Sequence, residues 1–205
     1  AIAILCHSAT NGSACHLSLR RDKGRSPQNK KTMRLYLTGY MGTGKSTLGR
    51  KIAKRTELPF LDTDKMVEEA EGAEVADIIT YAGEEYFREA ERRALEQTAE
   101  YESAIISTGG GLPVWGDNQA WIAEHGVSVY LKRTPEQILS RLSPHGRYKR
   151  PKLRGLSDDE VLQVMREGIA EREPIYSKAD VVIDCDKVND YEIVDKLVEF
   201  ITANF

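Results

Sequence analysis

One short segment constrains this chain more than any other, the run Gly39-Tyr-Met-Gly-Thr-Gly-Lys-Ser46 that follows the mostly apolar residues 35–38. It matches G-x-x-x-x-G-K-S, the pattern of a loop that binds phosphate between a strand and a helix. Glycines let the backbone turn tightly and bring its N–H groups against phosphate oxygens, and the following helix adds the positive end of its dipole. Residues 39–46, called the phosphate loop below, therefore predict a nucleotide-binding segment followed by a helix.

The residue types in the phosphate loop suggest how it would hold a nucleotide. Lys45 is expected against the β- and γ-phosphates, and the Ser46 hydroxyl is expected to hold Mg²⁺. A glycine-rich turn without a nucleotide is the alternative, which the strand before the loop and the helix after it make the weaker one. The residues expected to contact the nucleotide here are Gly42, Thr43, Gly44, Lys45, Ser46 and Thr47.

Length, composition and charge limit the other classes of function. The 205 residues are 40% hydrophobic and 30% charged, which suits one domain of ordinary composition. The sequence contains no apolar run long enough to span a membrane. A net charge of −3 gives no reason to expect nucleic acid as a partner. The three cysteines fit neither a metal site nor a disulfide framework, which is typical of reduced thiols in the cytoplasm.

Residues 1–32 differ from the rest of the chain. A short apolar patch comes first and a basic stretch with almost no acidic residues follows, an order that does not fit a secretory signal. A transit segment for an organelle is an open alternative. Because Met33 stands directly before the first strand, we expect residues 1–32 to be a disordered extension, such as a tag or an upstream-translated segment. The folded domain is then expected to comprise residues 33–205.

Beyond Met33, short apolar runs alternate with helical patterns. This alternation predicts a mostly parallel five-stranded sheet with helices on both faces, a three-layer α/β/α architecture. In such sheets ligands bind beyond the carboxyl ends of the strands. The expected strands are 34–38, 60–62, 104–107, 127–131 and 180–183, and the expected helices are 45–56, 64–71, 74–81, 84–101, 117–125, 135–142, 157–176 and 190–203.

Two carboxylates, Asp62 and Asp64, lie at the end of the second predicted strand. Near a nucleotide, such a pair can hold Mg²⁺ or take the proton of an attacking hydroxyl. The alternative is that one of them only caps the helix that begins near Lys65. Capping by one does not exclude chemistry by the other.

A helical pair and a run of glycines give two further signals. Arg88 and Glu91 are three residues apart and share a helix face, where a surface ion pair worth a few tenths of a kcal/mol is the plain interpretation. Gly109–Gly111 ends a strand, and three glycines suit backbone that approaches a ligand closely, although a simple turn is the alternative. Ser107 stands where other enzymes with a phosphate loop often carry an acidic Mg²⁺ residue, so Asp62 would supply the charge.

Residues 143–156, called the lid segment below, are rich in basic side chains, with proline and glycine near both ends. A basic segment in an otherwise acidic domain suggests an anionic ligand, and arginine binds carboxylate or phosphate with a planar, bidentate fork. We expect a mobile lid that excludes water when it closes, with a solvated surface loop as the alternative. Arg172, just before Pro174, is either an anion-binding residue or a surface arginine.

Together these motifs resemble those of the shikimate kinase family over about residues 33–205. The phosphate loop alone is unspecific, whereas the full set, in family order and at close to family spacing, is highly specific. The resemblance implies a P-loop kinase fold and transfer of the γ-phosphate of ATP to the 3-hydroxyl of shikimate, a step of chorismate and aromatic amino-acid biosynthesis. The shared elements are the phosphate loop, Asp62-Thr-Asp64, Phe87-Arg88 with Glu91, Gly109–Gly111, Arg150-Pro151 and Arg172–Tyr176.

On the nucleotide side, the resemblance implies that Lys45 and Ser46 are the phosphate and Mg²⁺ residues and that Asp62 is the carboxylate near Mg²⁺. Arg150 matches the lid arginine that reaches the transferring phosphate. Contacts to adenine match the family least well, because the lid segment is slightly long and the loop 186–189 departs from an arginine-bearing form. The candidates for these contacts are Arg141 and Asn189.

On the acceptor side, the resemblance implies that Asp64 holds the shikimate hydroxyls and is placed to accept the proton. Arg88 and Arg172 match the two arginines that grip the shikimate carboxylate, and Glu91 matches the acid that orients Arg88. Gly109, Gly110 and Gly111 would supply the backbone that lines the substrate.

Two other classes of function remain open from sequence alone. The first is another small-molecule kinase with a phosphate loop, such as a gluconate or nucleoside monophosphate kinase, although positions 62–64, 88, 91 and 172 suit a small acid that carries hydroxyls. The second is a binding protein without activity, against which the intact Lys45 and Asp64 argue. The expected substrates are therefore shikimate and ATP with Mg²⁺, handled by a monomeric cytoplasmic enzyme without nucleic-acid or membrane partners.

Overall fold

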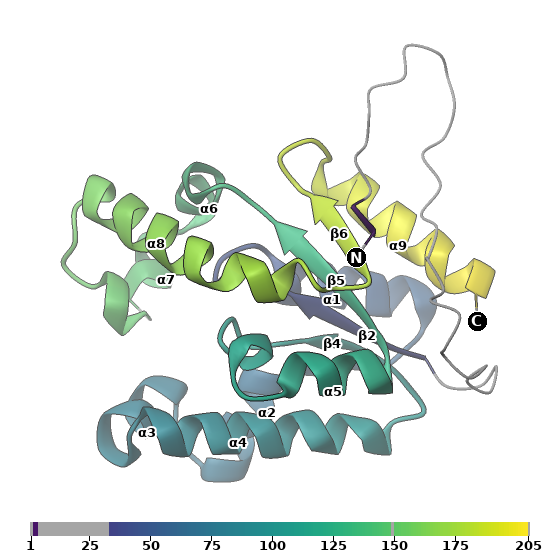
Figure 1. Cartoon of the computed structure of the whole chain (residues 1–205), viewed down its shortest axis with the longest axis horizontal. Coiled ribbons are helices and arrows are strands. Elements are labelled where there is room, and N and C mark those ends of the chain that lie inside the picture. The colour runs from purple at the N-terminus through teal and green to yellow at the C-terminus, as the bar shows by residue number, and fades with distance from the viewer. Residues whose placement is uncertain (1, 4–32, 149, 205) are drawn as a thin grey trace.

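The computed structural model describes residues 2–3, 33–148 and 150–204 (Figure 1). Five parallel strands in the order β6-β5-β2-β4-β3 form the sheet of the domain, which confirms the expected architecture. The two-residue strand β1 (Ile2–Ala3) pairs in parallel with β6 at one edge. Residues 4–32, expected to belong to a disordered extension, lie outside the described residues. The five strands are β2 (Met33–Thr38), β3 (Phe60–Asp62), β4 (Ser103–Ser107), β5 (Val127–Lys132) and β6 (Val181–Asp184).

The expected helices are all present, with ends that shift by at most four residues. The helix expected over 84–101 ends as an α-helix at Gln97 and continues as a 3₁₀ turn. The α-helices are α1 (Lys45–Thr56), α2 (Thr63–Glu71), α3 (Val75–Ala82), α4 (Glu84–Gln97), α5 (Asn118–His125), α6 (Pro135–Arg141), α7 (Pro144–Tyr148), α8 (Asp158–Tyr176) and α9 (Asp190–Asn204), and the 3₁₀ turns are η1 (Thr98–Glu100), η2 (Leu112–Val114) and η3 (Pro151–Leu153).

The lid segment contains more regular structure than the sequence suggested, because both α7 and η3 lie within it. It ends where Ser157 forms a capping box with Glu160, the first signal of helix α8. The sequence offered no periodic pattern over so few residues, and pieces this short depend on contacts from the rest of the fold.

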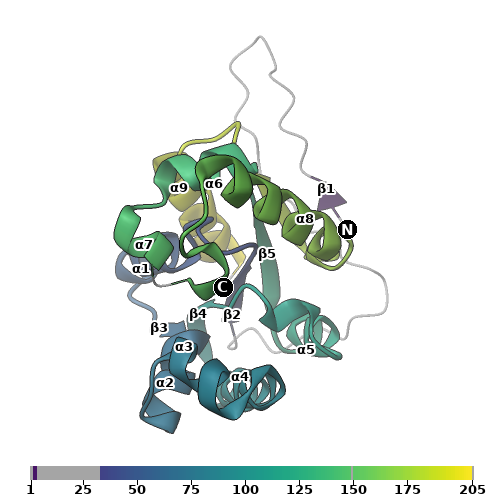
Figure 2. The same ribbon diagram turned by 90° about the vertical axis from the view of Figure 1, so that its left-hand side faces the viewer.

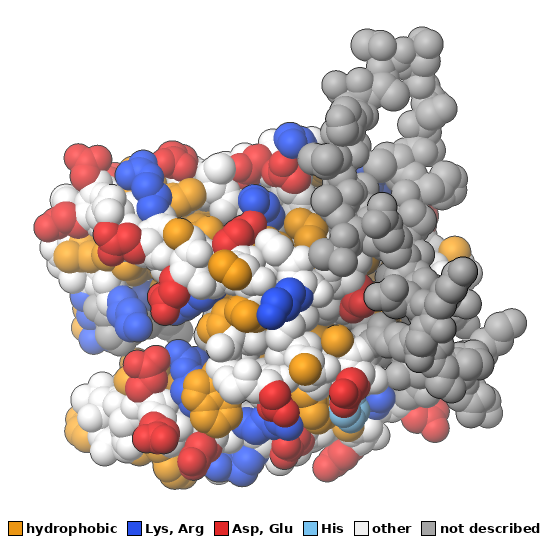
Figure 3. Space-filling model, viewed as in Figure 1, with side chains coloured by type: hydrophobic (Ala, Val, Ile, Leu, Met, Phe, Trp, Pro, Cys, Tyr) orange, Lys and Arg blue, Asp and Glu red, His pale blue; other side chains and the backbone are white. Residues whose placement is uncertain are grey.

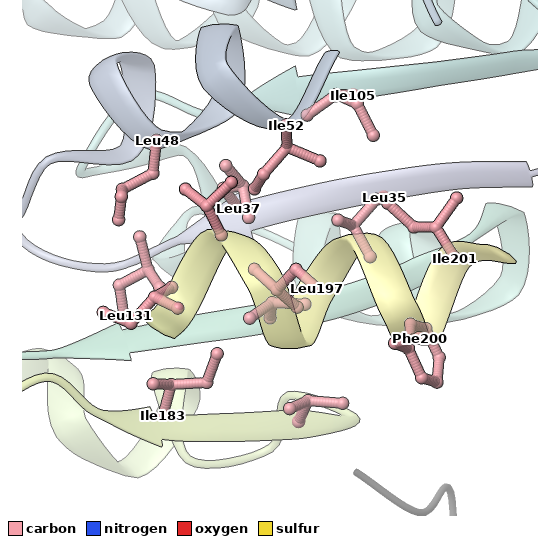
Figure 4. Close-up of a cluster of buried hydrophobic side chains, with 14 of the residues drawn as sticks. Leu35, Leu37, Leu48, Ile52, Ile105, Leu131, Ile183, Leu197, Phe200 and Ile201 are labelled. Atoms are coloured by element: carbon pink, nitrogen blue, oxygen red, sulfur yellow. The ribbon is translucent and has the colours of Figure 1, made fainter. Parts of the chain in front are cut away.

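Two helical layers enclose the sheet, as Figures 1 and 2 show from two directions. Helices α1 and α9 cover one face, and α4, α5 and α8 cover the other. Side chains alternate along a strand, so Leu35 and Leu37 of β2 join the cluster under α1 and α9 while Tyr36 joins the opposite one. Figure 4 shows the first cluster, in which Leu197 of α9 meets the central strands.

The register of the sheet brings several loops to one edge. Asp62 of β3 lies opposite Ser107 of β4, and Leu37 of β2 lies opposite the same Ser107. The phosphate loop follows β2 directly, and Gly42 and Gly44 take φ values of 80° and 97°, which L side chains rarely adopt. The carboxyl ends of three strands therefore open onto a shared space.

Among the described residues, no helix combines the length and the apolar character needed to cross a bilayer.

We expect Leu197→Ala to lower the free energy of unfolding by about 2–5 kcal/mol, because it leaves a cavity between α9 and the sheet. Glu199→Ala, on the exposed side of the same helix, is the control and should change stability by less than about 0.5 kcal/mol. Urea denaturation of both variants measures the two changes. Equal losses would contradict the assignment of α9 to the core.

Candidate active site

The phosphate loop folds around the side chain of its own lysine. Lys45 is only 7% exposed, and its Nζ donates to the carbonyl oxygens of Gly39 at 2.8 Å and Tyr40 at 2.9 Å. Burial lowers the pKa of Lys45 to about 8, although the nearby carboxylates of Asp64 and Asp62 oppose the shift. The ammonium group is thus held at the loop by acceptors that an anionic ligand can replace.

Three oxygen-bearing side chains meet beside this lysine. The Ser46 hydroxyl donates to Asp62 Oδ2 at 2.7 Å and lies 3.1 Å from the hydroxyl of Ser107. Asp62 occupies the N-cap position of α2 but makes no capping hydrogen bond with its side chain. The capping alternative for Asp62 is therefore wrong, and its carboxylate faces the phosphate loop.

The glycine triplet Gly109–Gly111 is explained by what lies against each residue. A Cβ at Gly109 would overlap the carboxylates of Asp64 and Glu91, and one at Gly111 would come within 2.7 Å of the Arg88 guanidinium carbon. A Cβ at Gly110 would lie 3.3 Å from the Met41 backbone nitrogen in the phosphate loop. The triplet is packed among charged groups and backbone from three segments, so it is more than a simple turn.

Two carboxylates converge on Gly109 from different helices. Asp64 lies in the first turn of α2, and Glu91 projects from the middle of α4 with 1% exposure. Burial raises the pKa of Asp64 to about 6, with Asp62 adding to the shift and Lys45 opposing it. Burial also raises the pKa of Glu91 to about 7, against the influence of Arg88. Both carboxylates are therefore harder to ionise than carboxylates that are exposed to water.

Arg88 is fixed by two acids of its own helix. Its Nη1 donates to Glu91 Oε2 at 2.5 Å and its Nη2 donates to Glu84 Oε1 at 2.8 Å. The Arg88 side chain is 16% exposed, and the Glu91 partner is buried. The surface ion pair considered from the sequence does not hold, because the pair faces inward against the glycine triplet.

Arg172 is held differently. Among the described residues no carboxylate forms an ion pair with it, and its guanidinium instead lies 5.2 Å from the centre of the Tyr40 ring. Tyr176, one turn further along α8, donates its hydroxyl to the carbonyl of Gly110 at 2.5 Å. Helix α8 is therefore tied to both the glycine triplet and the phosphate loop.

The lid segment brings Arg150 towards the same space. Its Nη1 donates to the carbonyl of Gly146, and burial lowers its pKa while the charge of Asp64 opposes the shift. Arg147 fastens the base of the lid segment, since it donates to Asp158 at 2.6 Å and to the Leu156 carbonyl at 2.8 Å. Figure 3 shows an indentation between the part of the surface formed by α7 and α8 and the part formed by α3 and α4.

The two candidates for adenine contacts lie near α9. Arg141 donates to Asp190 at 2.7 Å, and a Cβ at Gly44 would lie 3.5 Å from Arg141 Nη2, so this arginine borders the phosphate loop. The Asn189 side-chain oxygen accepts the backbone N–H groups of Tyr191 at 3.0 Å and Glu192 at 3.1 Å. The oxygen of Asn189 thus caps α9.

Sequence reasoning missed several residues that shape the site. The buried Arg133 donates to the Thr43 carbonyl at 2.9 Å and to Asp190 at 2.6 Å, which braces the phosphate loop from behind. The Thr63 hydroxyl accepts the Gly109 N–H at 2.9 Å. The Tyr40 ring contacts the Arg172 guanidinium, and the Tyr176 hydroxyl donates to the Gly110 carbonyl. The one signal for Arg133 in the sequence is its place directly after an apolar strand. No local pattern indicated the roles of Thr63, Tyr40 and Tyr176.

Comparison with known proteins places this geometry in a family. A family model described as shikimate kinase matches residues 41–202. The shikimate kinase of Bacteroides thetaiotaomicron is 36% identical over 167 residues, covering 82% of this chain and 95% of that protein. That of Parabacteroides distasonis is 40% identical over 155 residues, covering 76% and 89%.

Solved structures agree with these matches. The crystal structure of the Bacteroides thetaiotaomicron shikimate kinase superposes with a TM-score of 0.76 at 36% identity, covering 83% of this chain and 98% of that one. The shikimate kinase of Acinetobacter baumannii in complex with shikimate gives a TM-score of 0.75 at 28% identity, with 85% and 96% covered. The family model, the related sequences and the solved structures agree over most of the length of this chain, which therefore belongs to the shikimate kinase family.

Proposed function

We propose that this protein is a shikimate kinase, which transfers the γ-phosphate of ATP to the 3-hydroxyl of shikimate and releases shikimate 3-phosphate and ADP. The observation that carries the proposal is the meeting of two different half-sites at one edge of the sheet. A phosphate loop with a buried Lys45 lies beside a cluster of arginines and carboxylates. The complex of the Acinetobacter baumannii relative with shikimate supports this choice of acceptor.

The acceptor half suits a small acid that carries hydroxyl groups. Arg88 and Arg172 would bind its carboxylate, because a guanidinium offers two parallel N–H donors to two carboxylate oxygens. Asp64 and the backbone of the glycine triplet would then hold the ring and its hydroxyls. Arg172 forms no ion pair among the described residues, although its charge acts on Glu84 and Glu91, so its guanidinium donors could bind a ligand carboxylate.

The donor half suits the phosphates of ATP. The backbone N–H groups of the phosphate loop and the Lys45 ammonium would bind the phosphates, and Arg150 would reach the transferring group from the lid segment. Arg141, beside Gly44, is placed towards the rest of the nucleotide. Because the Asn189 oxygen already caps α9, only its amide nitrogen would be available for adenine.

The oxygen ligands where the phosphate loop meets the ends of β3 and β4 fit a magnesium ion. Mg²⁺ binds oxygen ligands, and the Ser46 hydroxyl and the Asp62 carboxylate lie together, with the Ser107 hydroxyl next to them. Ser46 and Asp62 would hold the ion, directly or through water. When bound with the nucleotide, Mg²⁺ would neutralise negative charge on the phosphate oxygens.

In this proposal Asp64 accepts the proton of the attacking hydroxyl. The pKa of Asp64 is raised to about 6, so the carboxylate is mostly ionised at neutral pH and is a better proton acceptor than an ordinary aspartate. It would orient the attacking hydroxyl and accept its proton as the phosphoryl group moves in line from ATP. Binding and positioning supply most of the catalysis in this chemistry.

A monomeric cytoplasmic enzyme remains part of the proposal. The most exposed large apolar side chains among the described residues are all tyrosines, whose hydroxyl groups suit contact with water. They are Tyr81, Tyr86, Tyr101, Tyr148 and Tyr191.

The direct test is a coupled assay of ADP release with shikimate, gluconate and AMP as acceptors. We expect ADP release with shikimate, and mass spectrometry of the product should show shikimate 3-phosphate. Omitting the acceptor controls for ATP hydrolysis. A preference for gluconate or AMP would replace the proposed activity by that of another small-molecule kinase, and binding of ATP without turnover would support a binding protein.

We expect Asp64→Asn to lower kcat by at least about 100-fold, because asparagine cannot accept the proton of the attacking hydroxyl. The melting temperature should stay near that of the wild type, since removal of a buried carboxylate next to Asp62 relieves repulsion. Glu69→Gln, at an exposed position of the same helix, is the matched control and should retain wild-type turnover. Near-normal kcat in Asp64→Asn would remove this residue as the proton acceptor.

We expect Arg88→Lys to raise the KM for shikimate by about tenfold or more, because lysine cannot bind a carboxylate through two parallel donors. The KM for ATP should change by less than about twofold. Arg92→Lys, which affects an arginine paired with Glu96 on the same helix, is the matched control. If the KM for shikimate is unchanged in Arg88→Lys, the proposed carboxylate site is wrong.

A further inference from the structure

Tyr40 belongs to the phosphate loop, but its backbone and its side chain contact different parts of the site. Its backbone carbonyl accepts Lys45 Nζ at 2.9 Å and the Thr43 hydroxyl at 2.9 Å, on the side where phosphate would bind. Its side chain is buried, with the residue 3% exposed, and packs in the cluster formed with helix α8. The backbone of Tyr40 therefore faces the nucleotide side of the site, and its ring faces the acceptor side.

The side chain of Tyr40 supports Arg172. The guanidinium carbon of Arg172 lies 5.2 Å from the centre of the Tyr40 ring, within the range of a cation–π interaction. The pKa of Tyr40 is raised by burial, and the charge of Arg172 opposes the shift, as expected for groups in close contact. On the neighbouring turn of α8, the Tyr176 hydroxyl is fixed to the carbonyl of Gly110.

This support matters because Arg172 forms no ion pair within the described part of the chain, and it acts on Glu84 and Glu91 only through longer-range charge. Arg88 is held by Glu84 and Glu91, whereas among the described residues no carboxylate forms an ion pair with Arg172. A free arginine side chain has many rotamers, and ordering it costs free energy when a ligand binds. An aromatic ring below the guanidinium reduces that cost without neutralising the charge that the ligand requires.

Helix α8 leaves room for this arrangement at Gly168. A Cβ at Gly168 would lie 2.7 Å from the Tyr40 hydroxyl oxygen and 3.0 Å from ring carbon Cε2. Gly168 does not have a positive φ, so close approach, rather than backbone conformation, explains why a glycine fits there. The ring is therefore held between Gly168 on one side and the phosphate loop from which it projects.

We propose that Tyr40 is a positioning residue for the acceptor: its ring holds the Arg172 guanidinium ready for the substrate carboxylate, so the phosphate loop also builds the shikimate site. This inference rests on the proposed function, in which Arg172 binds that carboxylate. The ring acts on acceptor affinity, while the Tyr40 backbone acts on the nucleotide. A change of the side chain should therefore separate the two affinities.

The first experiment compares Tyr40→Leu and Tyr40→Phe. Calorimetric titration with shikimate should show an affinity about tenfold lower for Tyr40→Leu, which lacks the ring, and Tyr40→Phe should restore most of it. The affinity of both variants for MgADP should stay within about twofold of the wild type. Tyr86→Leu is the matched control, because Tyr86 also carries an arginine over its ring, Arg93 at 5.7 Å, away from the site.

A double-mutant cycle tests whether Tyr40 acts through Arg172. Once Arg172→Met has removed the guanidinium, Tyr40→Leu should weaken shikimate binding no further, whereas independent effects would multiply. Gly168→Ala supplies a variant that leaves Tyr40 in place but pushes on its ring, and it should lower shikimate affinity without changing MgADP affinity. It also decides the matter if Tyr40→Leu does not fold.

The outcomes separate this inference from the proposed function. If wild-type protein does not bind shikimate, the proposed function fails and this inference fails with it. If the wild type binds shikimate, unchanged affinity in Tyr40→Leu overturns the role of the ring alone. Equal losses of shikimate and MgADP affinity would also overturn it, because they indicate general damage to the fold. Multiplicative effects in the cycle would overturn it as well, because they indicate that Tyr40 acts independently of Arg172.

Discussion

The register of the parallel sheet is the constraint on which the rest of the structure depends. Asp62 and Ser107 lie opposite each other at the ends of β3 and β4, and Leu37 of β2 lies in the same row. The loops that follow these three strands therefore begin at the same edge of the sheet, where carboxylate and hydroxyl oxygens meet the phosphate loop. A shift of one residue would turn each strand-end side chain to the opposite face of the sheet and separate these groups.

The second organising feature of the site is that its buried charged groups have compensating partners or shifted pKa values. Buried ions are costly unless they have partners. Lys45 is held by two carbonyls and Arg88 by two glutamates, while Asp64 and Glu91 respond to burial with raised pKa values. Arg172 lies over an aromatic ring and forms no ion pair with a carboxylate among the residues that the structure describes. This difference leaves one positive charge for a carboxylate ligand and suits a site that must bind a small acid next to a nucleotide.

The sequence predicted the fold well because its elements carry strong local signals. Helices such as α1 and α8 are long enough for a clear apolar period, and α8 begins with a capping box. The five-residue helix α7 was missed because it is too short to show a period. The alternative that Asp62 only caps α2 does not hold, since a hydroxyl of the phosphate loop offers the carboxylate a partner that no local pattern reveals.

What the sequence by itself determined is the local chemistry: glycines where the phosphate loop needs positive φ, the lysine and serine that follow them, and the motifs that identify the family. Only the tertiary structure decided which side chains meet. It buried the pair of Arg88 and Glu91 that the family resemblance had implied. It also filled the space beside each glycine of the triplet and placed the Tyr40 ring next to the Arg172 guanidinium. The physical reason is that near neighbours in the chain set backbone conformation, whereas contacts between distant residues depend on strand register and helix packing.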